Sequence, residues 1–222
     1  MNKKIFLIIK DQSERVKNKN FREICGVPLH EFYIRQRECF DIYIDTDSER
    51  IMEFYSDKSK WPNIKVYERA HEHVQMENSG NDSPAPKMIE RFLKEHVDND
   101  EEPIITSHIT SPLLSNKSIL EAYDYMSKYD SVSSVDAVQE FCVFENRPIN
   151  FDNSKIVKTQ SLQPVNVLNG AFFIIKKNVY FLNKYRRISD NHLYYPIPKI
   201  EAVDIDTEHD LKIAKILAEE KK

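Results

Sequence analysis

The chain has 222 residues, of which 41% are hydrophobic and 31% charged, and its formal net charge is −4. This composition is typical of a globular protein, and the length suits one sizeable domain. The weak negative charge argues against nucleic-acid binding across a whole face, and no apolar stretch approaches the ~20 residues that a membrane helix needs. Since the first residues lead into a strand without a signal peptide, we expect a cytoplasmic protein with no nucleic-acid or membrane partner.

The first predicted element is a buried strand over Lys4–Ile9, an apolar and β-branched run. A polar loop follows from Lys10 to Phe21, and a helix begins near Leu29. This order places positive charge at the carboxyl edge of a sheet, where open α/β folds bind ligands. Spacing alone leaves two interpretations open, a phosphate site and a solvated surface loop. The cations of the loop are Lys10, Arg15, Lys17 and Lys19.

The remaining pattern predicts alternating strands and helices. A long loop without apolar periodicity is predicted over Ala70–Pro86, and loops of this length are typical of lids or binding segments. The alternation indicates a three-layer α/β sandwich with a mostly parallel sheet. Strands are predicted at 41–46, 64–67, 103–106, 130–135, 170–175 and 202–205, and helices at 48–55, around 88–93, 115–126, 177–183 and from Thr207 onward. An excursion from the sheet at about 138–168 is predicted to contain short strands over 141–151 and 156–167.

Asp204 and Asp206 form a second candidate site, because alternate residues of a predicted strand share one face. Two adjacent carboxylates are suited to Mg²⁺, which prefers one or two carboxylates together with substrate phosphates and water. The alternative is that one aspartate faces solvent and the other caps the last helix. If both candidate sites meet in one crevice at the switch point of the sheet, the chain has the groups that nucleotidyl transfer needs.

In the order and spacing of its motifs the chain resembles the acylneuraminate cytidylyltransferase family, whose members make CMP-activated nonulosonic acids. The segments that carry the resemblance are the loop Lys10–Asn20 with Gly26-Val27-Pro28-Leu29, then Ile44–Ser48, Arg69, His108–Leu113, Asp130-Ser131, Asn169-Gly170-Ala171 and Val203–Thr207.

The resemblance implies a single Rossmann-like nucleotidyltransferase domain over residues 1–222, with a small β-rich dimerisation excursion that reaches the partner's active site in a homodimer. It implies transfer of CMP from CTP to an acidic sugar of the sialic, legionaminic or pseudaminic acid type, with Mg²⁺ as cofactor and release of pyrophosphate, in CMP-sugar and surface polysaccharide biosynthesis. The implied residues are Lys10 and Lys19 at the phosphates as catalytic cations, Ser13, Arg15, Asn20 and Arg69 at CTP, His108, Thr110, Lys158, Gln160 and Asn169 at the acceptor, and Asp204 and Asp206 at the metal.

The chain departs from the family pattern at four positions. Lys10 replaces an arginine, which loses the bidentate fork that suits phosphate, and Glu14 replaces a lysine inside the phosphate loop. His108 replaces a glutamine, and Thr159 stands where an arginine often precedes the glutamine, so that Lys158 is the remaining candidate for the sugar carboxylate. Two alternatives therefore stay open, a CTP-dependent transferase with a different acceptor and a nucleotide-binding homologue without turnover.

Overall fold

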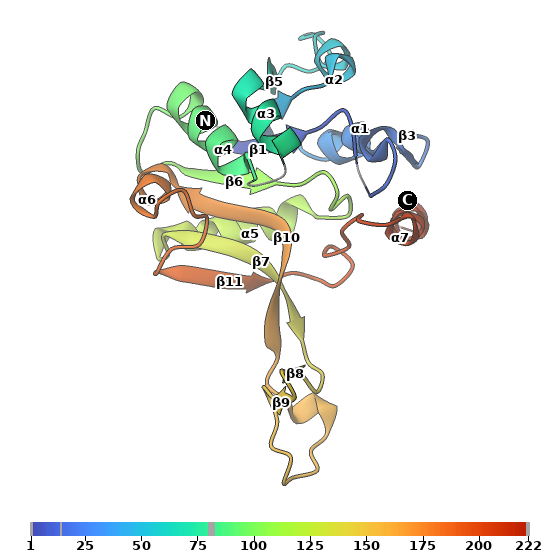
Figure 1. Cartoon of the computed structure of the whole chain (residues 1–222), viewed down its shortest axis with the longest axis vertical. Helices are drawn as coiled ribbons and strands as arrows, with labels where there is room; N and C mark the ends of the chain where they lie inside the picture. The colour runs from blue at the N-terminus through green and yellow to red at the C-terminus, as the bar shows by residue number, and fades with distance from the viewer. Residues whose placement is uncertain (1, 14, 80–82, 221–222) are drawn as a thin grey trace.

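A computed structural model of the chain describes residues 2–13, 15–79 and 83–220. Its centre is a seven-stranded sheet in the order β11-β7-β10-β6-β1-β4-β5 (Figure 1). Every pairing is parallel except those that β10 makes with β6 and β7, so the prediction of a mostly parallel sheet is confirmed. The strands are β1 (Lys3–Ile9), β4 (Phe40–Thr46), β5 (Ile64–Glu68), β6 (Pro103–Ser107), β7 (Ser131–Val138), β10 (Val165–Lys176) and β11 (His192–Pro196).

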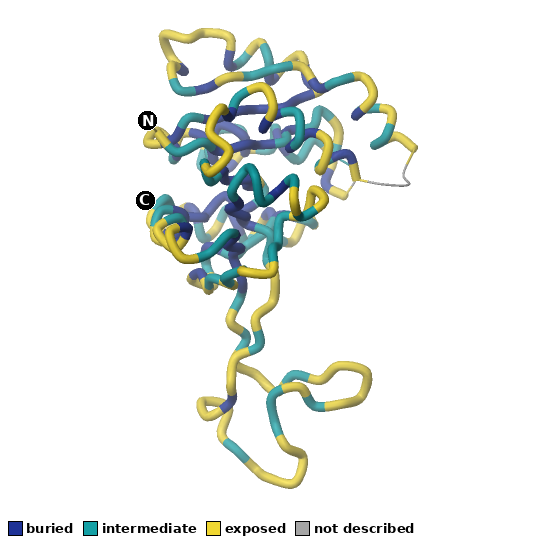
Figure 2. Tube along the Cα trace, turned by 90° about the vertical axis from the view of Figure 1, so that its left-hand side faces the viewer, coloured by how far each residue is buried: buried dark blue, intermediate teal, exposed yellow. Residues whose placement is uncertain are grey.

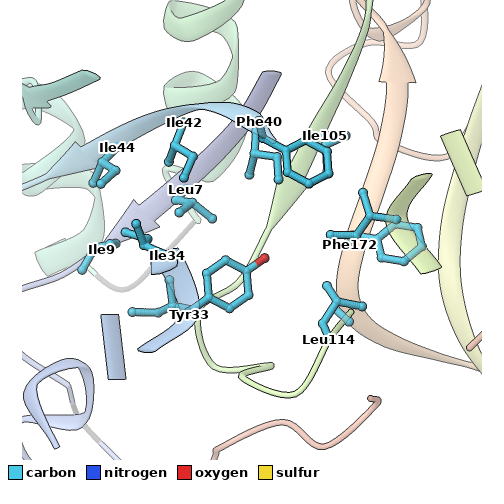
Figure 3. Packing of buried hydrophobic residues seen from close by; sticks show 14 of the residues in the cluster. Leu7, Ile9, Tyr33, Ile34, Phe40, Ile42, Ile44, Ile105, Leu114 and Phe172 are labelled. Atoms are coloured by element: carbon cyan, nitrogen blue, oxygen red, sulfur yellow. The ribbon is translucent and has the colours of Figure 1, made fainter. Parts of the chain in front are cut away.

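Helices cover both faces of the sheet, which confirms the three-layer architecture. Alternate residues of a strand point to opposite faces, so Leu7 packs in one hydrophobic cluster while its neighbour Phe6 packs in another. The larger cluster, shown in Figure 3, includes residues of α1 (Leu29–Arg35), α2 (Glu49–Phe54) and α5 (Asn116–Asp124). The opposite cluster contains residues of α4 (Ala85–His96) and α6 (Lys177–Leu182).

A third, smaller cluster joins the last helix to the start of the chain. The helix α7 (Glu208–Glu220) packs with buried residues near the hairpin of β2 (Glu23–Ile24) and β3 (Val27–Pro28). Thr207 caps this helix as predicted, because its Oγ1 accepts a hydrogen bond from the backbone N–H of Asp210 at 3.2 Å. The Asp210 carboxylate accepts in return from the Thr207 N–H at 2.7 Å, which completes a capping box.

Three local predictions are wrong. The loop expected over Ala70–Pro86 contains the helix α3 (His71–Ser79) and the start of α4; residues 80–82 of that span lie outside the described residues. The strand expected over Ala202–Ile205 is an irregular segment, and β11 was not predicted. Because α3 lies on the surface with His73 as its buried residue, its sequence has almost no apolar periodicity.

Residues 139–164, between β7 and β10, form an arm that projects from the body of the molecule (Figure 1). The arm contains the short strands β8 (Val143–Phe144) and β9 (Arg147–Pro148) and a 3₁₀ turn at Thr159–Ser161. Figure 2 shows that most of it is exposed. Among the helices built from the described residues, none has the length and apolarity that crossing a membrane requires.

The order of the strands creates a switch point between β1 and β6. From β1 the chain proceeds to β4 and β5 on one side, and it then returns to β6 on the other side of β1. The connections that leave the carboxyl ends of β1 and β6 therefore diverge, which opens a crevice at that edge of the sheet. The residues that follow β1 and β6 begin with Lys10 and His108.

Candidate functional site

A cleft of about 550 Å³ lies at the switch point between β1 and β6. It brings together segments that are far apart in the sequence: the loop after β1, the segment after β6, the middle of β10 and the segment before α7. The residues of the predicted site that line it are Lys10, Ser13, Arg15, Lys19, Asn20, His108, Thr110, Asn169, Asp204 and Asp206.

Two polar anchors hold the loop after β1 in position. The carboxylate of Asp11 accepts hydrogen bonds from Ser48 Oγ at 2.6 Å and from Arg50 Nη2 at 2.8 Å, and the bond from Ser48 is the main reason that the pKa of Asp11 is lowered. At the far end of the loop, the buried Asn20 donates from Nδ2 to the Lys10 carbonyl at 2.7 Å. The sequence interpretation missed the role of Asp11. Glu14, expected to weaken the loop, lies outside the described residues.

Asp206 neutralises two cations of this loop. Its Oδ2 lies 2.7 Å from Arg15 Nη1, and its Oδ1 lies 3.7 Å from Lys19 Nζ. Lys19 also donates to the carbonyl of Ile205 at 2.6 Å, which ties the loop to the segment before α7. That segment is irregular, but its side chains still alternate in direction. Ile205 is buried in the core, while Asp204 and Asp206 line the cleft.

Asp204 has the properties expected of a metal ligand. Burial raises its pKa, the charge of Asp206 raises it further, and a hydrogen bond from Thr110 opposes the rise. Its Oδ1 is buried and accepts no hydrogen bond from the described residues. An orphaned carboxylate oxygen beside a second carboxylate fits Mg²⁺. Among the described residues there is no group of three or more His, Cys, Asp or Glu side chains that could hold a metal ion.

Lys10 and Arg69 are connected through one carboxylate. Lys10 forms an ion pair with Glu77 of α3, and Arg69 Nη1 lies 2.9 Å from Glu77 Oε2. The fully buried Arg69 also donates from Nε to Asp45 Oδ1 at 2.9 Å. Arg69 therefore lies behind the cleft rather than in its lining. Its Nη2 lies 3.5 Å from the carbonyl of Ile9, the residue before Lys10, so Arg69 is close to the loop after β1 without lining the cleft.

The opposite end of the cleft is formed by β10, which has a register shift between Leu168 and Phe173. Gly170 occupies this irregular part with a φ of +71°, a conformation that glycine adopts without strain. The Asn169 side chain is fixed there, since its Oδ1 accepts from Ser134 Oγ at 2.6 Å and its Nδ2 donates to Asp136 Oδ1 at 3.2 Å. The amide of Asn169 thus borders the cleft in a fixed orientation.

His108 lines the cleft and keeps part of its surface exposed to solvent. Enclosure by the walls of the cleft lowers the pKa of His108, and the charges of Arg187 and Lys19 lower it further while Asp206 opposes them. The imidazole is therefore neutral at pH 7 and offers one donor and one acceptor. Lys158 and Gln160 lie on the exposed arm and do not line the cleft of their own chain.

The comparisons with known proteins agree with this geometry. Residues 11–195 match the family model described as cytidylyltransferase. N-acylneuraminate cytidylyltransferases of Streptococcus agalactiae serotypes V and III are each 30% identical over 183 residues, which cover 77% of this chain and 40% of each relative. The chain thus spans less than half the length of the curated relatives it matches.

Solved structures show the same fold at low sequence identity. A CMP:2-keto-3-deoxy-manno-octonic acid synthetase complexed with CTP has a TM-score of 0.65 at 14% identity, covering 99% of this chain and 100% of that chain. A 2-C-methyl-D-erythritol 4-phosphate cytidylyltransferase of Francisella tularensis has a TM-score of 0.62 at 13% identity, with coverages of 97% and 99%. These matches confirm the Rossmann-like nucleotidyltransferase fold.

Proposed function

Because the chain belongs to the cytidylyltransferase family, we propose that its cleft transfers CMP from CTP to a hydroxyl of an acidic nonulosonic sugar and releases pyrophosphate. One observation carries the proposal: the cations of the loop after β1 and the carboxylates of Asp204 and Asp206 line one cleft at the switch point of the sheet. This arrangement provides positive charge for a triphosphate and carboxylates for its metal.

In this proposal the loop after β1 binds the triphosphate. Lys10, Arg15 and Lys19 would act as fixed cations, and Ser13 would donate a hydrogen bond. Asn20, whose Nδ2 already donates to the Lys10 carbonyl, would hold the loop near the nucleotide. The preformed anchoring of the loop supports this assignment, because groups that are held before the reaction stabilise developing charge without reorganisation.

Asp204 and Asp206 would hold Mg²⁺ in this proposal. The ion, when bound, supplies positive charge that polarises the α-phosphate and stabilises the leaving pyrophosphate. Lys19 donates to the Ile205 carbonyl and lies close to Asp206. Its ammonium group would therefore stay beside the metal. A hydrogen bond from Thr110 would help to orient Asp204.

The chemical step is a displacement at phosphorus. The oxygen of the acceptor hydroxyl forms a bond to the α-phosphorus of CTP, in line with the bond from that phosphorus to the oxygen of the β-phosphate. The second bond breaks, pyrophosphate leaves with its electron pair, and the hydroxyl proton passes to solvent water. The chain contributes chiefly by positioning both substrates and by neutralising charge. At the acceptor end, the fixed amide of Asn169 and the neutral ring of His108 would hydrogen-bond to hydroxyl groups of the sugar.

We further propose that the arm pairs two copies of the chain. It exposes several apolar side chains to solvent, which is unfavourable for a monomer and typical of an association surface. Lys158 and Gln160 on this arm would then reach the acceptor in the partner's cleft. The exposed apolar residues of the arm are Phe141, Val143, Phe144, Ile149 and Ile156.

A second candidate keeps CTP and changes the acceptor. Solved structures with the same fold, at nearly the same similarity, are named for a 2-keto-3-deoxy-manno-octonic acid and for a methylerythritol phosphate. In both candidates the choice between a nonulosonic acid and another acceptor would depend on the residues at the acceptor end of the cleft, which include His108.

Pyrophosphate release from CTP and Mg²⁺ tests both candidates when it is measured with a panel of nonulosonic acids, 2-keto-3-deoxy-manno-octonic acid and methylerythritol phosphate. Turnover with nonulosonic acids supports the first candidate, and turnover only with another acceptor supports the second. Asp204→Asn and Asp206→Asn should each lower kcat by at least ~100-fold, as expected for loss of charge stabilisation at the metal. Glu208→Gln is the matched control, because Glu208 is close in sequence but pairs with Arg22 on the surface.

A further inference from the structure

Arg187, in the segment between α6 and β11, is half-buried and packs against a residue that lines the cleft. Its guanidinium carbon lies 3.9 Å from the centre of the Phe173 ring, and Phe173 lines the cleft. Stacking of this kind fixes the plane of a guanidinium group. Its Nη1 has one further contact, a long hydrogen bond of 3.5 Å to Thr106 Oγ1.

The charge of Arg187 has no carboxylate partner in residues 2–13, 15–79 and 83–220. None of the ion pairs in that part of the chain includes it, and burial lowers its pKa, although an arginine stays charged at any physiological pH. The neighbouring Arg186 differs, because it is exposed and donates to the carbonyl of Asn183 at 3.2 Å. An enclosed charge without a counter-ion is costly, and an anionic ligand would offset that cost.

Arg187 packs on a different strand from the one that leads into the phosphate loop. Phe173 belongs to β10, which is separated from β1 by β6, so it lies two strands, or about 10 Å, from the strand that leads into the loop. Arg187 is close enough to His108 to affect the titration of that ring. A Cβ placed on Gly170 of β10 would lie 4.0 Å from His108 Nδ1, so the ring and the strand border the same space.

We propose that Arg187 binds the carboxylate of the acceptor and thereby makes this chain selective for acidic sugars. The inference rests on the proposed function and adds a specificity-determining residue to it. A planar guanidinium can hold a carboxylate through two parallel hydrogen bonds, which gives both affinity and orientation. Stacking on Phe173 keeps the guanidinium group in place. A carboxylate held there would direct the acceptor hydroxyl toward the nucleotide. The carboxylate is recognised within one chain, whereas Lys158 would have to act from the arm of a partner.

Equilibrium binding tests the proposal without depending on turnover. Binding of N-acetylneuraminic acid and of its C1 amide, which lacks the negative charge, is measured by ligand-observed NMR with the wild type, Arg187→Gln, Arg187→Lys and Arg186→Gln. We expect the wild type and Arg186→Gln to bind the acid about 10- to 100-fold more tightly than the amide, as for a charge-assisted bidentate pair. Arg187→Gln should lose this preference, and Arg187→Lys should retain only part of it.

An equal preference in Arg187→Gln and the wild type, or no preference in the wild type, would overturn the proposal. Unchanged urea midpoints and unchanged CTP binding in each variant show that the fold and the nucleotide end are intact. Turnover with CTP and N-acetylneuraminic acid is recorded separately. Its absence would count against the proposed function, while the acid-to-amide ratio would still decide the role of Arg187.

Discussion

Replacing Arg69 with methionine should destabilise the fold strongly, because it leaves Asp45 buried without its counter-ion. Both side chains are 0% exposed, and Arg69 Nε lies 2.9 Å from Asp45 Oδ1. Removing one partner of such a pair costs about 3–5 kcal/mol, a large part of the ~5–15 kcal/mol that stabilises a typical protein. The other described partners of Arg69 are more exposed, so they should add little to the loss.

The destabilisation should depend on pH in a defined direction. Burial already raises the pKa of Asp45, and Arg69 opposes that rise. Without Arg69 the pKa of folded Asp45 rises further above its unfolded value, so the folded variant binds a proton that the unfolded chain releases more easily. As the pH falls toward this raised pKa, protonation stabilises the folded variant relative to the unfolded chain. The difference from the wild type should therefore be largest at pH 8 and smaller at pH 5.

Urea unfolding between pH 5 and pH 8 measures this difference, with fluorescence of the single tryptophan, Trp61, as the signal. Arg22→Met is the matched control, since Arg22 forms an ion pair with Glu208 at 2.8 Å on the surface and should contribute at most about 1 kcal/mol. A loss in Arg69→Met no larger than in Arg22→Met, or one that is constant from pH 5 to pH 8, would refute the reasoning. Asp45→Asn in the Arg69→Met background should restore part of the stability.

Three further predictions concern the cleft and the arm. Glu77→Gln should lower KM for CTP about 3- to 10-fold, because Glu77 neutralises Lys10; an unchanged or higher KM would contradict this. In NMR titrations the ring of His108 should show a pKa below 6.5, and Arg187→Gln should raise it, whereas a pKa at or above 6.5 in the wild type would contradict the enclosure described above. Phe144→Asp should weaken dimerisation at least ~10-fold in sedimentation experiments, and a wild-type chain that is monomeric at high concentration would exclude the dimer.

The central layers of the fold could be predicted because their sequence pattern has one physical cause. Strands buried on both faces need continuous apolar runs such as Ile5–Ile9, and the amphipathic helix α4 needs Met88, Phe92 and their neighbours on one face. The helix α3 gave no such signal, because contacts such as the ion pair between Glu77 and Arg69 hold it at the surface. Local sequence does not report contacts of that kind.

The same limit applies to the edges of the sheet. The strand β11 pairs only with β7, and it carries His192 and Pro196, which are unusual in a central strand. In the segment before α7 the alternation of Val203 and Ile205 with aspartates predicted a strand, but no strand in the described part of the chain pairs with this segment. The Ile205 N–H instead donates to the Thr110 carbonyl at 2.9 Å. The alternation of apolar and acidic residues thus predicted the directions of the side chains correctly, but the predicted strand pairing was wrong.

At the site, the sequence predicted groups that follow strands and missed groups that tertiary packing brings in. Lys10 and His108 come directly after β1 and β6, so topology alone places them at the crevice. Arg187 follows no strand and belongs to no motif; its guanidinium group packs on Phe173, which lines the cleft. Asp11 likewise anchors the loop through Ser48, a residue that only the parallel pairing of β1 with β4 brings close.

The charges of the cleft suggest how a nucleotide would enter it. Lys10 is paired with Glu77, and Arg15 and Lys19 are paired with Asp206. A triphosphate can take over these cations only if the carboxylates gain another partner, since an unpaired charge in a partly enclosed site is costly. A divalent cation would be such a partner for Asp206, so binding of the metal and of the triphosphate should be strongly coupled. CTP affinity without Mg²⁺ should accordingly be low in the wild type and should increase in Asp206→Asn, the opposite of the effect of that substitution on turnover.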